Sequence, residues 1–388
     1  MERISILCAA DRNNYGDLLF PLVLDEYLKK YDGRYCLDNY GVVKSNLAYY
    51  GALKTQSYKD FEANTQNGGR LVIGGGEILF PSWSRLYGYI NPRFNRLYKA
   101  GGIFYKLEVK YQISRRLLSS GKHLFPFTPQ INARCFYNSV GGIDIDHLPP
   151  GKKKTAINIL KKAEVLSVRD NRTAEVLGNY GLNPQVVPDS ALIMSDYFPI
   201  HVLESKVSRG LRDLLPEKYI VLQMGRRLAP SDLVGFIKKL KSLSCELGMK
   251  VVCCPIGLAE GHEDDIILKK ICSLEPSFDY IDPKNLYDIM YTIARADVYM
   301  GTSLHGLITS LSFGVKFIPM NKAVHKMSRY CQTWTEPLGI LECIDYDGDW
   351  QDIAAIINNW DIGLTNKLAI QQKAMVYRNF DLFFDDCQ

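Results

Sequence analysis

Short apolar runs alternate along the chain with longer segments in which apolar residues recur every three or four positions. Runs of the first kind predict buried strands, and segments of the second kind predict helices with one buried face. The expected strands are residues 3–8, 70–73, 165–168, 219–223, 250–254, 298–300 and 315–319. The expected helices are residues 18–30, 172–180, 231–247, 264–273, 286–295 and 305–313. This alternation is typical of an α/β protein whose parallel sheets are covered by helices.

The length of the chain and one irregular stretch predict two domains. At 388 residues the chain exceeds one typical core. The alternation is interrupted at residues 195–217, which contain Pro199 and Pro216. We therefore predict one Rossmann-like domain at residues 1–196 and a second at residues 197–388.

Residues 83–135 depart from the alternation and form an expected insertion in the first domain. Between residues 83 and 122 there are nine Lys or Arg residues, eight aromatic residues and a single acid, Glu108. Cationic side chains near anionic lipid headgroups contribute about 1 kcal/mol each, so this segment is a candidate for contact with a membrane surface or an anionic acceptor. The alternative is a solvated helical insertion whose aromatic side chains pack on their own domain.

The overall composition limits the class of protein. A net charge of +5 is compatible with an anionic ligand but is too weak for the basic footprint of a nucleic-acid-binding protein. We expect no secretory signal, because a strand-like run follows Met1 directly, and no membrane span, because no apolar run approaches about 20 residues. The ten cysteines include no Cys-x-x-Cys pair, which favours reduced thiols in the cytoplasm.

The first candidate turn follows the strand at residues 3–8. Asn14 and Gly16 let the backbone bend, and Asp17 either caps the next helix or accepts a hydrogen bond from a sugar hydroxyl. The dinucleotide-binding pattern Gly-x-Gly-x-x-Gly is absent. A dinucleotide cofactor is therefore excluded here, and Asn14, Gly16 and Asp17 remain candidates for binding a sugar.

The second candidate turn follows the strand at residues 70–73. Gly74, Gly75 and Gly76 permit the backbone to approach a sugar or a phosphate closely. A Walker loop is excluded, because no Gly-Lys-Ser/Thr follows. Glu77 is either a base for an acceptor hydroxyl or a structural residue.

The third candidate turn follows the strand at residues 298–300 and contains Thr302, Ser303, His305 and Gly306. We expect a helix to begin at about His305, so that one imidazole lies beside backbone N–H groups that have no partner within the helix. Such a site can hold an anion and transfer a proton. The alternative is a histidine that only caps the helix.

Three arginines could add positive charge near these turns. Arg226 and Arg227 follow the strand at residues 219–223 and suit bidentate binding of a phosphate or a carboxylate, although one of them could be solvated surface. Arg169 ends another strand, and its alternative role is an ion pair with Asp170. No metal site is predicted, because the acids at residues 263–265 are better explained as helix caps.

In order and spacing, these pieces resemble the polysaccharide pyruvyl transferase family. The resemblance rests on residues 14–17, 72–76, 167–173, 187–192 and 296–306, and it covers most of the chain. It implies two Rossmann-like domains that face each other across a cleft, as in GT-B glycosyltransferases, the first on the acceptor side and the second on the donor side.

The resemblance also implies a reaction. A pyruvyl unit passes from phosphoenolpyruvate, a co-substrate rather than a cofactor, to two hydroxyls of a sugar, which form a cyclic ketal. His305 is then the catalytic acid or base, and Arg169 binds the donor anion. Capsule or exopolysaccharide assembly suggests an acceptor linked to undecaprenyl diphosphate at the inner face of the membrane.

One departure concerns the donor site. Many members of the family have an arginine two residues before the histidine, where this chain has Ser303. Either another arginine supplies the charge here, or the donor differs. The competing hypotheses are a GT-B-type glycosyltransferase that uses a sugar nucleotide, and a non-catalytic member of the family.

Overall fold

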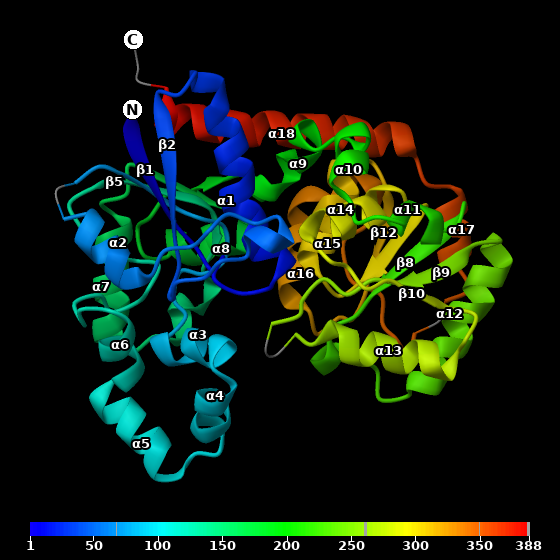
Figure 1. The fold of residues 1–388 in the computed structure, drawn as a ribbon, viewed down its shortest axis with the longest axis horizontal. Helices are drawn as coiled ribbons and strands as arrows, with labels where there is room; N and C mark the ends of the chain where they lie inside the picture. The colour runs from blue at the N-terminus through cyan, green and yellow to red at the C-terminus, as the bar shows by residue number, and fades with distance from the viewer. Residues whose placement is uncertain (67, 260–261, 349, 386–388) are drawn as a thin grey trace. The chain divides into compact units, whose positions relative to one another are not determined.

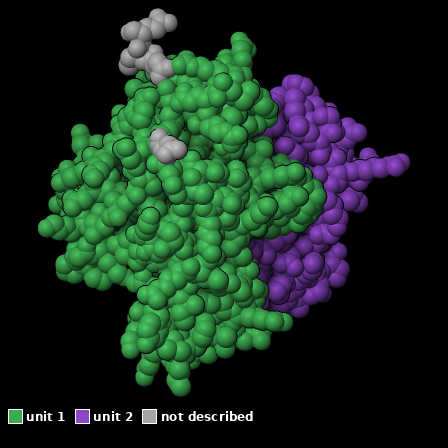
Figure 2. Space-filling view, turned by 60° about the vertical axis from the view of Figure 1, so that its left-hand side comes forward, with its two compact units in different colours: residues 1–190, 375–388 green, residues 191–374 purple. Residues whose placement is uncertain are grey.

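The structure, a computed structural model, describes residues 1–66, 68–259, 262–348 and 350–385. The chain forms two compact units, which Figure 2 distinguishes by colour. Unit 1 consists of Met1–Ser190 and Met375–Gln388, and unit 2 consists of Ala191–Ala374. The expected domains were residues 1–196 and 197–388, so the division lies a few residues earlier and the C-terminal segment belongs with unit 1.

Unit 1 contains a seven-stranded parallel sheet in the order β2-β1-β3-β5-β6-β7, with β4 paired to β5 (Figure 1). The strands are β1 (Glu2–Leu7), β2 (Tyr35–Tyr40), β3 (Arg70–Ile73), β4 (Gly76–Glu77), β5 (Arg134–Gly141), β6 (Val165–Val168) and β7 (Gln185–Val186). The helices are α1 (Tyr15–Leu28), α2 (Tyr58–Asn64), α3 (Trp83–Ile90), α4 (Pro92–Lys99), α5 (Gly102–Tyr111), α6 (Ile113–Leu118), α7 (Pro150–Leu160) and α8 (Asn171–Gly178).

Alternate residues of the unit 1 strands pack against different helices. Leu71 and Ile73 of β3 belong to a hydrophobic core shared with α2, α3, α7 and α8. On β5, Phe136 packs against Phe383 and Phe380 of the last helix, with ring centroids 5.2 and 6.1 Å apart. The period of two along each strand therefore places apolar side chains on both faces of the sheet.

The expected insertion is helical. Helices α3 to α6 form a group beside the sheet, drawn in cyan in Figure 1. Trp83 anchors this group, because its indole N–H donates to the backbone oxygen of His123 at 3.1 Å and its ring lies 4.7 Å from that of Tyr58. The expected end of the insertion at residue 135 is corrected, since β5 already begins at Arg134.

Unit 2 contains a five-stranded parallel sheet in the order β10-β9-β8-β11-β12. The strands are β8 (Tyr219–Gln223), β9 (Lys250–Cys253), β10 (Asp279–Tyr280), β11 (Val298–Gly301) and β12 (Lys316–Pro319). The helices are α9 (Met194–Tyr197), α10 (Ile200–Lys206), α11 (Leu211–Leu214), α12 (Leu233–Leu247), α13 (Asp264–Leu274), α14 (Leu286–Ala294), α15 (Leu304–Ser312), α16 (His325–Trp334) and α17 (Ile353–Asn358), and α18 (Ile362–Phe384) continues into unit 1.

One face of this sheet supplies the main core of unit 2. Ile220 and Leu222 of β8 and Val298 and Met300 of β11 are fully buried against α12, α13 and α17. The predicted class, α/β with two parallel-sheet units, is confirmed. In the described part of the chain, none of the helices has the apolar length that a membrane crossing needs.

Candidate functional site

In each unit the turns singled out in the sequence lie where the strand order changes direction. In unit 1, β1 is flanked by β2 and β3, and the turns after β1 and β3 contain Asn14 and Gly74. In unit 2, β8 is flanked by β9 and β11, and the turns after β8 and β11 contain Arg226 and Thr302. Ligands of open α/β sheets bind outside the carboxyl ends of the strands at such positions. The topology therefore marks one candidate site in each unit.

The unit 2 site is centred on the turn between β11 and α15. Ser303 is the N-cap of α15, and its hydroxyl accepts a hydrogen bond from the backbone N–H of Gly306 at 3.4 Å. His305 is the second residue of the helix and is half-buried. The expected position of this imidazole in the first turn of a helix is thus found, and Ser303, not the histidine, is the capping residue.

Tyr299 of β11 packs against this turn and limits its shape. The hydroxyl oxygen of Tyr299 lies 3.2 Å from Oε1 of Gln223 and 3.3 Å from the backbone oxygen of Ser303. A Cβ atom added to Gly306 would come within 2.1 Å of the same hydroxyl oxygen. Position 306 is therefore a glycine because the tyrosine occupies the space of a side chain.

A buried network that the sequence analysis missed joins three strand ends. Gln223, the last residue of β8, accepts from the backbone N–H of Thr302 at 3.0 Å and donates to Asp264 Oδ2 at 2.7 Å. The same carboxylate oxygen accepts from the N–H groups of Ile256 and Gly257 at 3.0 and 2.9 Å. Asp264 was expected to be a helix-capping acid; instead, its carboxylate holds the loop after β9.

Burial gives this carboxylate an unusual protonation equilibrium. Asp264 is 1% exposed. Desolvation raises its pKa to about 6, although hydrogen bonds from Gly257, Gln223 and Ile256 act in the opposite direction. Because a charge this poorly solvated is costly, burial favours the protonated form of Asp264.

Two arginines lie in the turn after β8. This turn is hydrogen-bonded to the turn that contains Thr302. The backbone N–H of Gly225 donates to Thr302 Oγ1 at 3.1 Å. Arg226 is about half-exposed, and its Nη1 lies 3.1 Å from Glu263 Oε2. Arg227 is exposed and forms no ion pair with the residues that the structure describes. Of the two, Arg227 therefore has the guanidinium with more freedom to bind an anion.

In unit 1 the turn after β1 differs from the expectation for Asp17. Helix α1 begins at Tyr15, three residues earlier than predicted, and its N-cap position is Asn14. Asp17 therefore lies within the first turn, where its Oδ2 accepts from Asn14 Nδ2 at 2.8 Å. Of the two roles expected for Asp17, the capping role was wrong, because the N-cap is Asn14. Gly16 is buried in the same helical turn.

The same turn contains a buried cation that the sequence analysis missed. Arg12 is 8% exposed and pairs with Asp11 at 2.9 Å. The second oxygen of Asp11 accepts from the N–H groups of Val42 and Val43 at 2.7 and 3.1 Å. The guanidinium lies 5.7 Å from the ring centroid of Tyr89 in α3. The helical insertion thus reaches the carboxyl edge of the unit 1 sheet.

Different physical constraints explain why each of the three positions after β3 is a glycine. A Cβ atom at Gly74 would lie 2.7 Å from Cβ of Cys8, and one at Gly75 would lie 2.5 Å from the ring of Phe20. Gly76 has a φ of +95°, which favours glycine. Close packing accounts for the first two glycines, and backbone conformation accounts for the third.

Buried Arg169 and Asp189 form an ion cluster with the partly exposed Glu77 at the same edge of unit 1. Arg169 Nη2 lies 2.9 Å from Glu77 Oε2, and Arg169 Nη1 lies 3.8 Å from Asp189 Oδ2. Burial lowers the pKa of Arg169, but the neighbouring carboxylates outweigh this effect and raise it. Asp170, the partner expected as the alternative, caps α8 by accepting from the N–H of Thr173 at 2.7 Å, and its charge adds a smaller contribution to the raised pKa of Arg169.

The candidate residues fall into two groups. Unit 1 contains the expected acceptor residues together with Arg169, which had been assigned to the donor. Unit 2 contains the remaining expected donor residues. Across the described parts of both units, no three His, Cys, Asp or Glu side chains converge on a metal-sized site.

The fold and the two turn sites define a class of protein. It has two Rossmann-like α/β units, as proteins with the GT-B fold do. The family model for polysaccharide pyruvyl transferase matches residues 14–321, from the turn after β1 to a point beyond His305. The chain belongs to this family. No curated protein sequence matches it.

Solved structures agree on the fold. The UDP-GlcNAc 2-epimerase of Methanocaldococcus jannaschii superposes with a TM-score of 0.56 at 9% identity, covering 97% of this chain and 99% of that one. The UDP-N-acetylglucosamine 2-epimerase of Rickettsia bellii gives 0.55 at 12% identity, covering 99% and 97%. At this identity the likeness concerns the fold alone.

Proposed function

We propose that the protein transfers a pyruvyl group from phosphoenolpyruvate to two hydroxyls of a sugar and forms a cyclic ketal. Membership of the family supports transfer to a polysaccharide precursor. The observation that carries the proposal is the half-buried His305 in the first turn of α15, where the strand order changes. This position combines a proton carrier with helix N–H groups that suit an anion.

The proposed reaction balances without a cofactor. Protonation of the methylene carbon turns it into a methyl group and leaves a cationic centre at C2. One sugar hydroxyl adds to C2, the bond from C2 to the phosphate oxygen breaks, and the second hydroxyl closes the ketal. The sugar hydroxyls lose two protons. One restores the acid that protonated the carbon, and the other leaves with inorganic phosphate.

His305 is proposed to deliver the proton to carbon, and Glu77 to accept a proton from the acceptor hydroxyl. The side chain of Glu77 is about one-third exposed, so a substrate can reach it. Arg169 keeps a proposed role as a donor ligand, but its charge is already balanced by Glu77 and Asp189. An incoming anion would have to displace one of these carboxylates.

Because Ser303 is uncharged, the donor needs another cation. We propose Arg227, with Arg226 beside it, because their turn is hydrogen-bonded to Thr302 through Gly225. The donor carries a tetrahedral phosphate and a planar carboxylate. A guanidinium can bind either anion with two hydrogen bonds. Asn14, Gly16 and Asp17, with the turn Gly74, Gly75 and Gly76, are proposed to face the sugar.

The acceptor is proposed to be a sugar linked to undecaprenyl diphosphate, used for capsule or exopolysaccharide assembly on the cytoplasmic side of a membrane. The exposed basic and aromatic residues of α4 to α6 support this part of the proposal.

The test is turnover of purified protein with phosphoenolpyruvate and lipid-linked sugars. We expect phosphate release together with a mass gain of one pyruvate ketal on the acceptor. His305→Ala should lower the rate by about 10²–10⁴ at an unchanged melting temperature. His201→Ala, which alters an exposed histidine of α10, is the control. Turnover only with a sugar nucleotide would instead establish a glycosyltransferase. Absence of turnover with either donor would point to a non-catalytic member.

A further inference from the structure

Helix α5 has the reverse of the usual distribution of side chains. Its acid, Glu108, is 2% exposed and accepts hydrogen bonds from Ser84 Oγ at 2.7 Å and from the backbone N–H of Ser114 at 3.1 Å. Its aliphatic residues face solvent, with Ile103 78% and Val109 55% exposed. A soluble helix normally buries its apolar stripe and exposes its acids. Among the residues that the structure describes, the exposed side of α5 therefore has no apolar partner.

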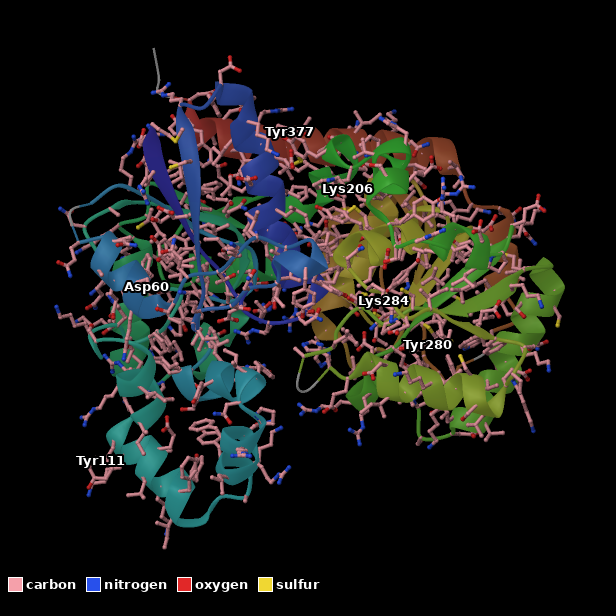
Figure 3. The ribbon with its side chains drawn as sticks, viewed as in Figure 1. Asp60, Tyr111, Lys206, Tyr280, Lys284 and Tyr377 are labelled. Atoms are coloured by element: carbon pink, nitrogen blue, oxygen red, sulfur yellow. The ribbon has the colours of Figure 1, made fainter. Side chains whose placement is uncertain are left out.

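The neighbouring helices extend this face. The exposed large apolar side chains of α4 to α6 are Leu97, Ile103, Tyr105, Leu107, Val109, Tyr111, Ile113 and Leu117. The exposed cations of the same helices are Arg93, Arg96, Lys99, Lys106, Lys110 and Arg116. Figure 3 shows Tyr111 on the side of α5 turned away from α4. Glu108 is the only acid between residues 92 and 118, and it is buried, so the exposed charge of this surface is entirely positive.

The combination of charges and apolar groups selects one kind of partner. Exposed aliphatic side chains among lysines and arginines suit the boundary between lipid headgroups and acyl chains. A second copy of the same face would bring like charges together. A nucleic acid would use the cations but would gain nothing from Ile103 and Val109.

We propose that the face of α4 to α6, here called the α5 face, docks onto an anionic lipid bilayer with α5 lying in the headgroup region. This inference deepens the proposed function, which expects a membrane-linked acceptor. It does not depend on the donor chemistry, because lipid binding needs neither phosphoenolpyruvate nor turnover. The Arg12–Tyr89 contact places the base of the same helical group at the edge of the unit 1 sheet.

The test is flotation of the full chain with vesicles of phosphatidylcholine alone and with vesicles that also contain phosphatidylglycerol. We expect binding only to the anionic vesicles, weakened by salt. The charge variant Lys106→Gln/Lys110→Gln should lower the vesicle affinity by roughly 25-fold, because each cation near an anionic surface contributes about fivefold. The apolar variant Ile103→Ser/Val109→Ser should also lose affinity but keep its salt dependence.

Matched control variants are available in unit 2. Lys238→Gln/Lys270→Gln removes two exposed lysines, and Val234→Ser/Ile266→Ser removes two apolar side chains that are 52% and 47% exposed. Both should bind vesicles like the wild type. The proposal is overturned if the wild type binds neither vesicle, or if control and α5-face variants lose equal affinity. It is also overturned if the α5-face variants only convert a dimer into a monomer in light scattering. Loss of turnover with intact vesicle binding would count against the ketal chemistry alone.

Discussion

At the scale of single residues, the glycine at position 306 is the most constrained member of the candidate site. Its missing side chain makes room for Tyr299, whose ring carbon Cζ would lie 2.2 Å from an added Cβ. We expect Gly306→Ala to destabilise unit 2 by about 1–3 kcal/mol, the usual cost of overpacking. Urea unfolding measures this change. Gly178→Ala in α8, where an added Cβ meets nothing within 4 Å, should be neutral or slightly stabilising, and equal losses in both variants would refute the packing explanation.

Asp264 provides a pH-dependent prediction with a definite sign. Its pKa in the folded protein is raised from 3.8 to about 6, mainly by burial. The cost of burying the charge is therefore absent below about pH 4, grows as the pH rises, and reaches about 3 kcal/mol above pH 6. Asp264→Asn removes the charge, so its free energy of unfolding should rise relative to the wild type over this interval.

Urea unfolding at several pH values, followed by tryptophan fluorescence, measures this difference. Trp334, Trp350 and Trp360 all lie in unit 2, so the signal comes mainly from the unit that contains the network. A difference between variant and wild type that stays constant from pH 4 to pH 7 would show that Asp264 is not the titrating group.

Some of these site residues could be predicted from the sequence and others could not, for physical reasons. His305 and the glycine turns could be predicted, because short local patterns define a strand, a turn and a helix start. Gln223 and Asp264 could not, since their roles depend on hydrogen bonds between residues that are 41 and 79 positions apart. Arg12 was concealed for the same reason, because its partner Asp11 is held by the distant backbone of Val42.

At the scale of secondary structure, apolar strands were predictable and polar strands were not. The predicted strands at 70–73, 165–168 and 219–223 have the same bounds in the structure. Strands β2 and β5 were missed because they contain buried polar residues. The side-chain amide of Asn39 in β2 donates a hydrogen bond to Thr55 Oγ1 at 3.0 Å, and that of Asn138 in β5 donates to Ser190 Oγ at 2.9 Å.

Strand β5 also contains a bulge that no periodic pattern could indicate. The register between β5 and β6 shifts between Tyr137 and Val140, and Ser139 has a φ of +49°. This conformation is unusual for a residue other than glycine. It is held by bonds from the backbone N–H of Ser139 to Ser167 Oγ at 2.9 Å and from Ser139 Oγ to the backbone oxygen of Pro188 at 2.8 Å.

At the scale of the whole molecule, the path of the chain was the least predictable feature. The expected second domain ran to residue 388, but the end of α18 packs in unit 1. Phe380, Phe383 and Phe384 are fully buried there, and Arg70 of β3 donates to the backbone oxygen of Phe383 at 2.8 Å. No turn or break within α18 marks the passage from one unit to the other, so the sequence has no local signal for it.

This path predicts which unit a mutation at the end of α18 will destabilise. Phe380 lies 4.7 Å from the ring of Tyr27 in α1, and Phe380→Ala should destabilise unit 1 by about 3–5 kcal/mol because it leaves a cavity in the core. Hydrogen–deuterium exchange should become faster in β1 and β5 while β8 and β9 keep their protection, since exchange reports the stability of each region separately. Leu382→Ala on the same helix, where the side chain is 55% exposed, should leave both sheets unchanged. Faster exchange in β8 and β9 after Phe380→Ala would mean that the end of α18 stabilises unit 2, contrary to the packing described for unit 1.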